Sequence, residues 1–537
     1  MNAPSLRRVV VVGGGTAGYF AALAIRAALP SLTVVLVESS AVPIIGVGEA
    51  TTTLMPPFLH QDLGIDAVEL FEAVRPTFKL GIRFLWGPAT GEFSYPFGDA
   101  DPIEAYVHDG DLRSQSLVAM LMATDRAPVL RGPAGELLSL LPRLKFAYHL
   151  DNAPFVRFLA ERAAKLGIEH VELTVASVER SENGDISALI GTDGARVHGD
   201  FFIDASGFRS LLVEDTLGSP FQSWDSSLFC DRAIVATVPQ AGVVQPYTTA
   251  ETMNAGWCWR IPVEGEDHRG YVHASAFLDE DRAVEEMRAK NPGMSDPWIV
   301  RFRSGRHRDF WLNNTVAVGN AYGFVEPLES TALHMVIIEL AYLVRGLGAL
   351  LQGDPTYRDF ANRAVGDHWD FLRWFLAVHY RYNDRLDTPF WSAARREVDI
   401  SGLEADVELL RTRGARSLTA KKAGDPAFGV SGLLMLLLGQ RVAPREVFEP
   451  VLDEVAWRDR TTKQRGIAAR ALPQSEALAV LRANPDMLRA FQRSPASWCT
   501  APAERAARLA ATGQLVGPTS GLPAVASDES LTRALRK

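Results

Sequence analysis

The stretch that most constrains the fold is a glycine-rich turn near the N-terminus, GGGTAG at residues 13–18. An apolar run at residues 9–12 precedes it, as expected of a strand buried on both faces of a parallel sheet. Helix-forming residues follow as far as Pro30, and a second apolar run at residues 33–37 ends in Glu38. A strand, a glycine turn, a helix and a strand that closes on an acid form the dinucleotide-binding unit. The N-terminal part therefore predicts an α/β domain that binds a nucleotide.

The residue types in this turn suit a bound pyrophosphate. Glycines let the backbone approach it closely, and the start of the following helix offers free amides and the positive end of the helix dipole. Glu38 can accept hydrogen bonds from a ribose. A purely structural glycine turn would not need the strand, the helix and the acid in register. The nucleotide-binding residues expected here are Gly13, Gly15, Thr16, Ala17, Gly18 and Glu38.

Length, charge and cysteine content exclude several classes of protein. The chain has 537 residues, 47% hydrophobic and 22% charged, which is typical of a globular protein with two or three lobes. A net charge of -9 gives no reason to expect nucleic acid or an anionic membrane as a partner. Three widely separated cysteines argue against a disulfide framework and against a zinc site. We therefore expect a cytoplasmic protein without a bound metal.

The longest apolar segment is expected to be a buried helix. It covers residues 332–351 but contains His334, Glu339 and Arg345, which a membrane span rarely carries.

Two segments after the first unit lack a clear functional signature by pattern alone. Residues 78–84 alternate strictly, so that Phe78, Leu80, Ile82 and Phe84 share one face of a strand and Lys79 lies on the other. A lysine opposite a core face is usually solvated, and this is the interpretation that the pattern favours. Residues 86–110 are aromatic but interrupted by glycine and proline, which predicts a long loop.

The middle of the chain returns to the nucleotide-binding sheet. Short predicted strands with turn signals follow residue 170 and end in FFIDASG at residues 201–207, a strand that runs into a turn of small residues. This arrangement favours a two-layer flavoprotein. In GWCWRIP at residues 256–262, Trp257 and Trp259 share one face of a strand and form a broad aromatic wall.

A further strand and glycine turn, residues 315–321, leads to FVEPLEST at residues 324–331 and to a helix that starts near Ala332. Ser330 and Thr331 are natural N-cap residues, and a helix dipole would stabilise a nearby carboxylate at Glu329. Unpaired amides at the helix start could also hold a small anion.

The sequence after residue 350 predicts a mostly helical part of the structure. The expected domains are an FAD-binding domain over residues 1–350 with an inserted substrate-side sheet and loops, a helical C-terminal subdomain over residues 351–512, and a loosely ordered tail over residues 513–537.

Together these motifs resemble the flavin-dependent tryptophan halogenases over roughly residues 8–395. The resemblance rests on GGGTAG, IGVGEAT at residues 45–51 around Val47, Lys79 in its strand, GWCWRIP for the family's WxWxIP, FVEPLEST, and RLDTPFW at residues 385–391. It implies a mixed α/β (α+β) flavoprotein fold of the glutathione-reductase and aromatic-hydroxylase type with a mostly helical C-terminal subdomain. It also implies further FAD contacts at Gly48, Ala50, Val178, Asn320 and Leu333.

The resemblance implies a specific chemistry. Reduced FAD, oxygen and chloride or bromide would give hypohalous acid, with the halide held at Thr331 and Ala332. Lys79 would activate this acid, either by hydrogen bonding or as a haloamine. Glu329 would stabilise the cationic ring intermediate and take its proton. The final implied role is that of Trp257 and Trp259, which would separate the flavin from the substrate.

The implied partners are a small aromatic substrate and a separate flavin reductase, because no second nucleotide-binding motif is visible. A homodimer is one assembly that the resemblance allows.

Some residues depart from the family pattern. Ala332 stands where the family usually has glycine, residues 86–150 are shorter than in the free-tryptophan enzymes, and the C-terminal part contains no Tyr-Tyr-Glu clamp for an amino-acid moiety. Tryptophan, free indole, an indole derivative and a larger indole-containing molecule all stay open as substrates. The alternative functions are an FAD-dependent aromatic monooxygenase, which would need neither Lys79 nor the double tryptophan, and a non-catalytic flavin-binding protein.

Overall fold

A computed structural model describes residues 6–42, 48–240, 242–400, 402–413, 429–442 and 450–493. Residues 45–47 of the second glycine motif, which include Val47, and the predicted tail over residues 513–537 lie outside these ranges.

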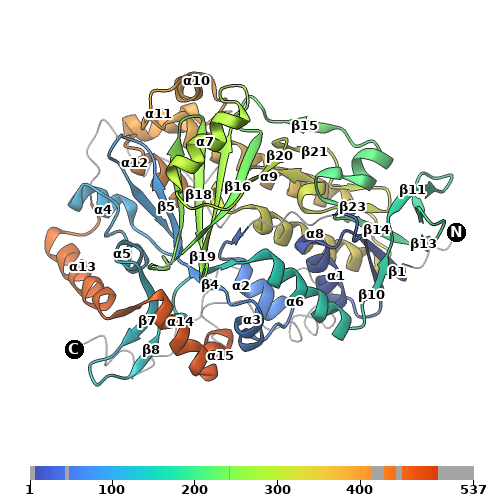
Figure 1. The fold of residues 1–537 in the computed structure, drawn as a ribbon, viewed down its shortest axis with the longest axis horizontal. Coiled ribbons are helices and arrows are strands. Elements are labelled where there is room, and N and C mark those ends of the chain that lie inside the picture. The colour runs from blue at the N-terminus through green and yellow to red at the C-terminus, as the bar shows by residue number, and fades with distance from the viewer. Residues whose placement is uncertain are drawn as a thin grey trace.

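The predicted nucleotide-binding unit forms the centre of a six-stranded sheet (Figure 1). Strand β1 (Arg8–Val12), helix α1 (Thr16–Ala28) and strand β2 (Thr33–Glu38) follow the predicted order, and β1 pairs with β2 in parallel. The sheet order is β10-β2-β1-β14-β23-β22. The other strands are β10 (Glu169–Glu172), β14 (Phe201–Asp204), β22 (Trp311–Leu312) and β23 (Thr315–Ala317). All neighbours are parallel except β22 and β23.

Both faces of this sheet are covered, which explains the uninterrupted apolar runs. Helix α1 packs against α6 (Asn152–Lys165) and α8 (Ala332–Leu351) on one side. On the other side lies the three-stranded sheet β11 (Val175–Arg180), β12 (Ile186–Gly191) and β13 (Arg196–His198), whose apolar side chains form one cluster with Val10, Val12, Val35 and Val37.

A second large sheet lies beside the first and is mostly antiparallel (Figure 1). Its order is β20-β16-β19-β18-β17-β5-β6, and only β17 and β5 pair in parallel. The strands are β5 (Gly81–Leu85), β6 (Phe93–Pro96), β16 (Arg232–Pro239), β17 (Thr248–Met253), β18 (Gly256–Pro262), β19 (Glu266–His273) and β20 (Trp298–Arg301). Strand β18 carries the predicted aromatic wall.

The prediction of one continuous strand over residues 78–84 with a solvated Lys79 is wrong. Strand β4 (Thr77–Lys79) pairs with β9 (Ala147–Leu150), which also pairs with β3 (Glu49–Ala50), whereas β5 belongs to the second large sheet. The chain changes sheets at Leu80, whose amide donates to the Pro246 carbonyl at 2.7 Å. Because protein covers both sides of β4, Lys79 is completely buried.

The long loop predicted over residues 86–110 is also wrong. This segment contains β6 and helix α4 (Pro102–Asp109). Pro102 opens the helix at the first position, where its missing amide costs nothing, so the proline marks a helix start and not a loop.

Within the described residues, the C-terminal part is largely helical, as predicted. Its helices are α9 (Tyr357–Arg381), α10 (Pro389–Glu397), α11 (Glu404–Arg413), α12 (Gly429–Gly439), α13 (Glu454–Ala469), α14 (Gln474–Ala483) and α15 (Pro485–Arg493). Helix α9 packs against α8, and α14 contacts β4.

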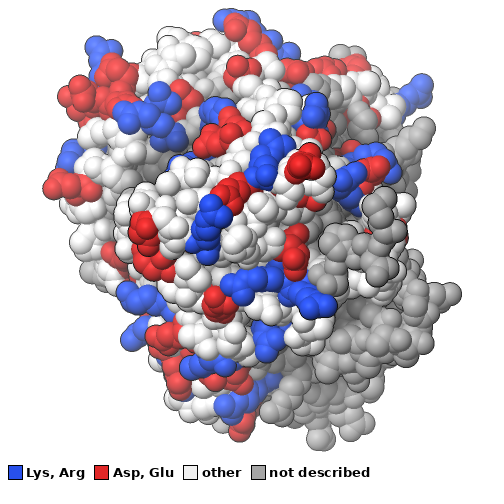
Figure 2. Space-filling model, turned by 90° about the vertical axis from the view of Figure 1, so that its right-hand side faces the viewer, with Lys and Arg blue, Asp and Glu red and all other residues white. Residues whose placement is uncertain are grey.

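Helix α8 is long and apolar enough to span a membrane by length and composition alone, but half of that stretch is buried inside the protein. Positive and negative side chains are interspersed over the face that Figure 2 shows.

Candidate active site

The two predicted catalytic side chains approach each other from distant parts of the chain. Lys79 lies at the end of β4, and its Nζ donates to the Ser330 hydroxyl at 2.6 Å and to the Thr51 carbonyl at 2.9 Å. Ser330 directly follows Glu329, the last residue of the short 3-10 turn η5 (Pro327–Glu329). Both Lys79 and Glu329 are buried. An early strand and a much later turn therefore bring an amine and a carboxylate to one site.

The surroundings of Lys79 decide its charge. Burial lowers the pKa of the Lys79 amine to about 7, and the nearby Glu329 carboxylate partly opposes this shift. The amine also lies 5.3 Å from the centre of the Phe97 ring. A lysine in this state exchanges its proton near neutral pH, unlike a solvated lysine.

Ser330 adopts a left-handed backbone conformation with φ 59°. Such a conformation is unfavourable for a residue other than glycine and typically costs about 1–3 kcal/mol. It closes the turn, in which the Ser330 amide donates to the Pro327 carbonyl at 2.9 Å. The turn presents the Ser330 hydroxyl to Lys79 while Glu329 contacts a different element.

That element is the last turn of α9. Nε2 of His379 lies 2.8 Å from Oε1 of Glu329, and both side chains are almost completely buried. Nδ1 of His379 lies 3.0 Å from the Phe375 carbonyl. Sequence reasoning missed His379, because it lies in an aromatic segment whose helical spacing indicated only packing.

A second glutamate of the FVEPLEST segment holds the aromatic wall. The indole nitrogen of Trp257 donates to Oε2 of Glu326 at 2.9 Å, and the Tyr380 hydroxyl donates to the same oxygen. Burial raises the pKa of Glu326 to about 7. The ring centres of Trp257 and Trp259 are 5.9 Å apart, so the two indoles form the continuous wall that their spacing predicted. The roles of Glu326 and Tyr380 were not predicted.

The N-cap prediction at the start of α8 is confirmed for the position of Thr331 but not for a capping hydrogen bond. Thr331 occupies the cap position but makes no side-chain capping bond, and its buried hydroxyl has no hydrogen-bond partner. Ser330 is engaged by Lys79 instead. An unpaired hydroxyl at a helix start fits a small anion bound by Thr331 and Ala332.

The glycine turn before α1 is packed on one side and open on the other. Gly13 has φ 128°, and a Cβ there would collide with the Ala205 carbonyl, whereas a Cβ at Gly15 would meet open space. Gly18 packs directly on the Gly13 backbone. The Thr16 hydroxyl at the start of α1 is buried without a partner. These residues fit a pyrophosphate at the helix start.

The remaining predicted flavin-binding residues lie on several different elements. Glu38 accepts hydrogen bonds from Tyr19 at 3.2 Å and pairs with His170 at 2.5 Å. Asn320 lies in the turn η4 (Gly319–Ala321), which packs against the side chain of Ala17. The others are Gly48, against the His268 ring, Ala50 on β3, Val178 on β11 and Leu333 in the first turn of α8.

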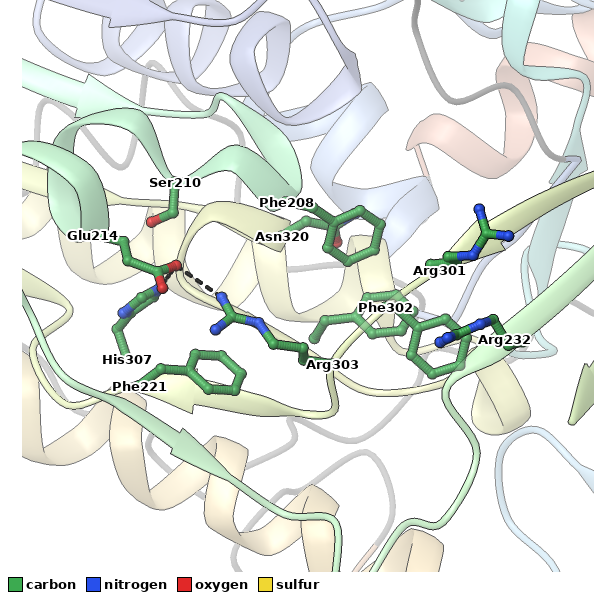
Figure 3. A pocket seen from close by; sticks show the side chains of 11 residues that line it. Phe208, Ser210, Glu214, Phe221, Arg232, Arg301, Phe302, Arg303, His307 and Asn320 are labelled. Carbon is green, nitrogen blue, oxygen red and sulfur yellow. Dashed lines mark hydrogen bonds and ion pairs between the residues drawn. The ribbon is translucent and has the colours of Figure 1, made fainter. Parts of the chain in front are cut away.

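A cavity of about 340 Å³ opens beside Asn320 (Figure 3). The rings of Phe208, Phe302 and Phe324 contact one another on an aromatic side of it. Arg303 pairs with Glu214 in its lining at 2.8 Å. Its lining includes one predicted flavin-binding residue, Asn320, but neither Lys79 nor Glu329. We therefore separate this cavity from the proposed halogenation site.

The protein-family model described as tryptophan halogenase matches residues 8–456 of this chain. Tryptophan 7-halogenase RebH of Lentzea aerocolonigenes is 32% identical, over 79% of this chain and 85% of RebH. The 7-chloro-L-tryptophan 6-halogenase KtzR of Kutzneria sp. is 34% identical, over 75% of this chain and 85% of KtzR.

The similar solved structures are also halogenases. MibH, described as a lanthipeptide tryptophan 5-halogenase, has 47% sequence identity and a TM-score of 0.88, with 95% of this chain and 99% of MibH covered. The flavin-dependent halogenase BrvH from Brevundimonas sp. BAL3 has 30% identity and a TM-score of 0.79, with 89% of this chain and all of BrvH covered. These likenesses confirm the mixed α/β flavoprotein fold.

Proposed function

Because the chain belongs to the tryptophan halogenase family, we propose that Lys79 and Glu329 carry out its halogenation step. The protein is a flavin-dependent halogenase for an indole-type aromatic substrate, and FAD is its cofactor. When bound, reduced FAD supplies hypohalous acid from oxygen and a halide. The single observation that carries the proposal is the hydrogen bond from Lys79 to Ser330, which places the amine beside the residue that follows Glu329.

The two side chains have complementary tasks. Lys79 donates a hydrogen bond to the oxygen of hypohalous acid, or forms a haloamine with it, and so presents an electrophilic halogen to the ring. Glu329 stabilises the cationic ring and accepts the proton from the carbon that received the halogen. The hydroxide part of the acid takes a proton from the Lys79 amine and leaves as water, the ring gains a halogen and loses its proton to Glu329, and the amine regains its proton from water before the next turnover. A positioned base of this kind typically contributes a rate factor of about a hundred to ten thousand.

Other residues prepare this step. We assign the halide, chloride or bromide, to the start of α8 at Thr331 and Ala332, because an unpaired hydroxyl is buried there. The pyrophosphate of FAD fits the turn formed by Gly13, Gly15 and Gly18, and Thr16 follows it. Trp257, which Glu326 holds, and its neighbour Trp259 would keep the aromatic substrate away from the flavin. A separate reductase would deliver the reduced flavin.

For the substrate we propose a tryptophan side chain within a peptide. MibH, whose description gives a lanthipeptide, shares 47% of its residues over nearly the whole of both chains. The C-terminal part of this chain also contains no Tyr-Tyr-Glu sequence to bind the amino-acid moiety of free tryptophan. A substrate recognised by its peptide backbone would not need that clamp.

The test is a competition assay with FAD, a flavin reductase, NADH, oxygen, and chloride or bromide. Free tryptophan, indole and tryptophan-containing peptides are offered together, and products are identified by mass spectrometry. We expect a halogenated peptide, and no halogenated product from Glu329→Gln, because an amide is a poor proton acceptor. Hydroxylated products would support the monooxygenase alternative. Preferred halogenation of free tryptophan would overturn the peptide assignment alone.

A further inference from the structure

We propose that His379 is a positioning residue that shares one proton with Glu329 and keeps this carboxylate charged until it accepts the proton of the ring. This inference rests on the proposed role of Glu329 as the base.

The hydrogen bonds of the His379 ring fix where its protons lie. Nδ1 faces the Phe375 carbonyl at 3.0 Å, and a carbonyl oxygen can only accept, so Nδ1 carries a hydrogen. Nε2 faces Oε1 of Glu329 at 2.8 Å, a distance that requires one proton between the two atoms. The pair is therefore either an imidazolium with a carboxylate or a neutral imidazole with a carboxylic acid.

Three features favour the imidazolium and the carboxylate. His379 lies in the last turn of α9, where the negative end of the helix dipole stabilises a cation. A buried carboxylate without a positive partner favours its neutral form, and an adjacent cation opposes this. Lys79 cannot supply that cation throughout the neutral range, because burial lowers its pKa to about 7. His379 is the second source of positive charge beside Glu329.

Other charged groups around the pair come from two further elements. Lys79 approaches from β4, and Glu326 lies in the loop before η5, where its carboxylate interacts electrostatically with His379. The other faces of the imidazole are aromatic, with ring centres at 5.3 Å for Phe84 and 5.6 Å for Phe375. When Glu326 is ionised, its negative charge also favours a protonated His379, and burial raises the pKa of Glu326 to about 7.

The backbone around His379 is anchored, so the ring has a fixed position. The indole nitrogen of Trp86 donates to the His379 carbonyl at 2.7 Å, and the neighbouring Tyr380 donates to Glu326. Two consecutive residues at the end of α9 thus hold the two glutamates of the FVEPLEST segment. His379 keeps Oε1 of Glu329 occupied and leaves Oε2 for the proton from the ring.

The proton balance of the step is simple. Before the reaction the pair holds one proton, on His379. The ring carbon releases its proton to Oε2 of Glu329, and the electron pair of that bond restores the aromatic ring. The pair then holds two protons and one net positive charge, and it returns one proton to water before the next turnover.

The test compares His379→Gln with wild-type enzyme on a substrate carrying hydrogen or deuterium at the halogenated carbon. Glutamine can still donate a hydrogen bond to Glu329 but cannot carry the positive charge. We expect an isotope effect near unity in the wild type, a normal primary isotope effect in His379→Gln, and a rate reduced by about tenfold or more, within the range of a positioned base. Release of hypohalous acid, followed with a chemical trap, should be unchanged.

The matched control is His108→Gln. His108 also lies beside a buried carboxylate, with its Nε2 3.6 Å from Glu104, but on α4. The His108→Gln substitution should leave the halogenation rate and the isotope effect unchanged. If His379→Gln retains the wild-type rate without an isotope effect while Glu329→Gln is inactive, the role of His379 is wrong and the proposed function stands. If Glu329→Gln is fully active, the proposed function itself is wrong.

A measurement on the wild-type enzyme covers the case in which His379→Gln does not fold. Nitrogen NMR of labelled histidines at pH 8 should show one buried ring with both nitrogens protonated, and this signal should change in Glu329→Gln. Absence of such a ring from the wild-type spectrum would overturn the proposal.

Discussion

The amine of Lys79 donates a 2.6 Å hydrogen bond to the hydroxyl of Ser330, a residue 251 positions later in the chain. The contact joins β4 to the start of α8, and it places a buried lysine next to the turn that carries Glu329. A lysine without a function would rarely be buried here, because removing an ammonium group from water is costly. The relationship therefore supports a chemical task for the amine and motivates the first two predictions.

Replacing the amine should stop halogenation and spare the earlier steps. Lys79→Met keeps the length of the buried side chain and removes its hydrogen-bonding head. We expect loss of halogenated product, with FAD binding and hypohalous acid release near wild-type levels. The measurements are product analysis by mass spectrometry, flavin fluorescence titration and a chemical trap for the acid. Lys165→Met, at an exposed position at the end of α6, serves as the control. Wild-type yield from Lys79→Met would remove the lysine from the mechanism.

The buried lysine should also make stability depend on pH. Its pKa is about 7 in the folded protein and 10.5 ordinarily, so between these values the unfolded chain binds more protons than the folded one. The free energy of unfolding of the wild type, relative to Lys79→Met, should therefore rise between pH 7 and 10.5, by at most about 1.4 kcal/mol per pH unit. Below pH 7 the full cost of burying the charge remains, and Lys79→Met should be the more stable protein. Urea unfolding at several pH values tests this, and a difference independent of pH would contradict it.

The methyl group of Ala332 should influence which halide is used. Ala332 is the first residue of α8, where we propose that the halide binds, and the resembled family usually has glycine there. Ala332→Gly should lower the KM for bromide more than the KM for chloride, because bromide is the larger ion. Steady-state halogenation at varied halide concentration measures both constants. Ala349→Gly, near the end of the same helix, controls for the loss of helix stability, about 1 kcal/mol. An equal change for both halides would place the binding site elsewhere.

The aromatic wall offers a comparison between two neighbouring tryptophans. Trp257 donates to Glu326, whereas the indole nitrogen of Trp259 is buried without a partner. Trp257→Phe should lower the free energy of unfolding by about 1–3 kcal/mol more than Trp259→Phe, because only the first change removes a hydrogen bond from a buried carboxylate. Chemical denaturation of both variants measures the difference. Equal losses would mean that the bond to Glu326 contributes nothing to the wall.

The sequence by itself determined the nucleotide-binding unit and the family. Residues 8–38 form one contiguous segment. Its strand, turn, helix and strand follow from hydrophobic periodicity and from the conformations that only glycine adopts readily. The tryptophan pair of β18 was equally predictable, because residues two apart on a strand share a face.

The tertiary structure decided what surrounds each of these groups. Local alternation indicated a solvated Lys79, but the chain changes sheets at Leu80 and buries it. Ser330 was predicted to cap α8, but its hydroxyl instead accepts a hydrogen bond from Lys79 at the end of β4. His379 and Tyr380 looked like packing residues of a helix, and only the position of α9 against the FVEPLEST segment brings them to Glu329 and Glu326. Propensity and periodicity describe a residue's neighbours along the chain, whereas charge state and hydrogen bonding depend on neighbours in space, which only the folded chain brings together.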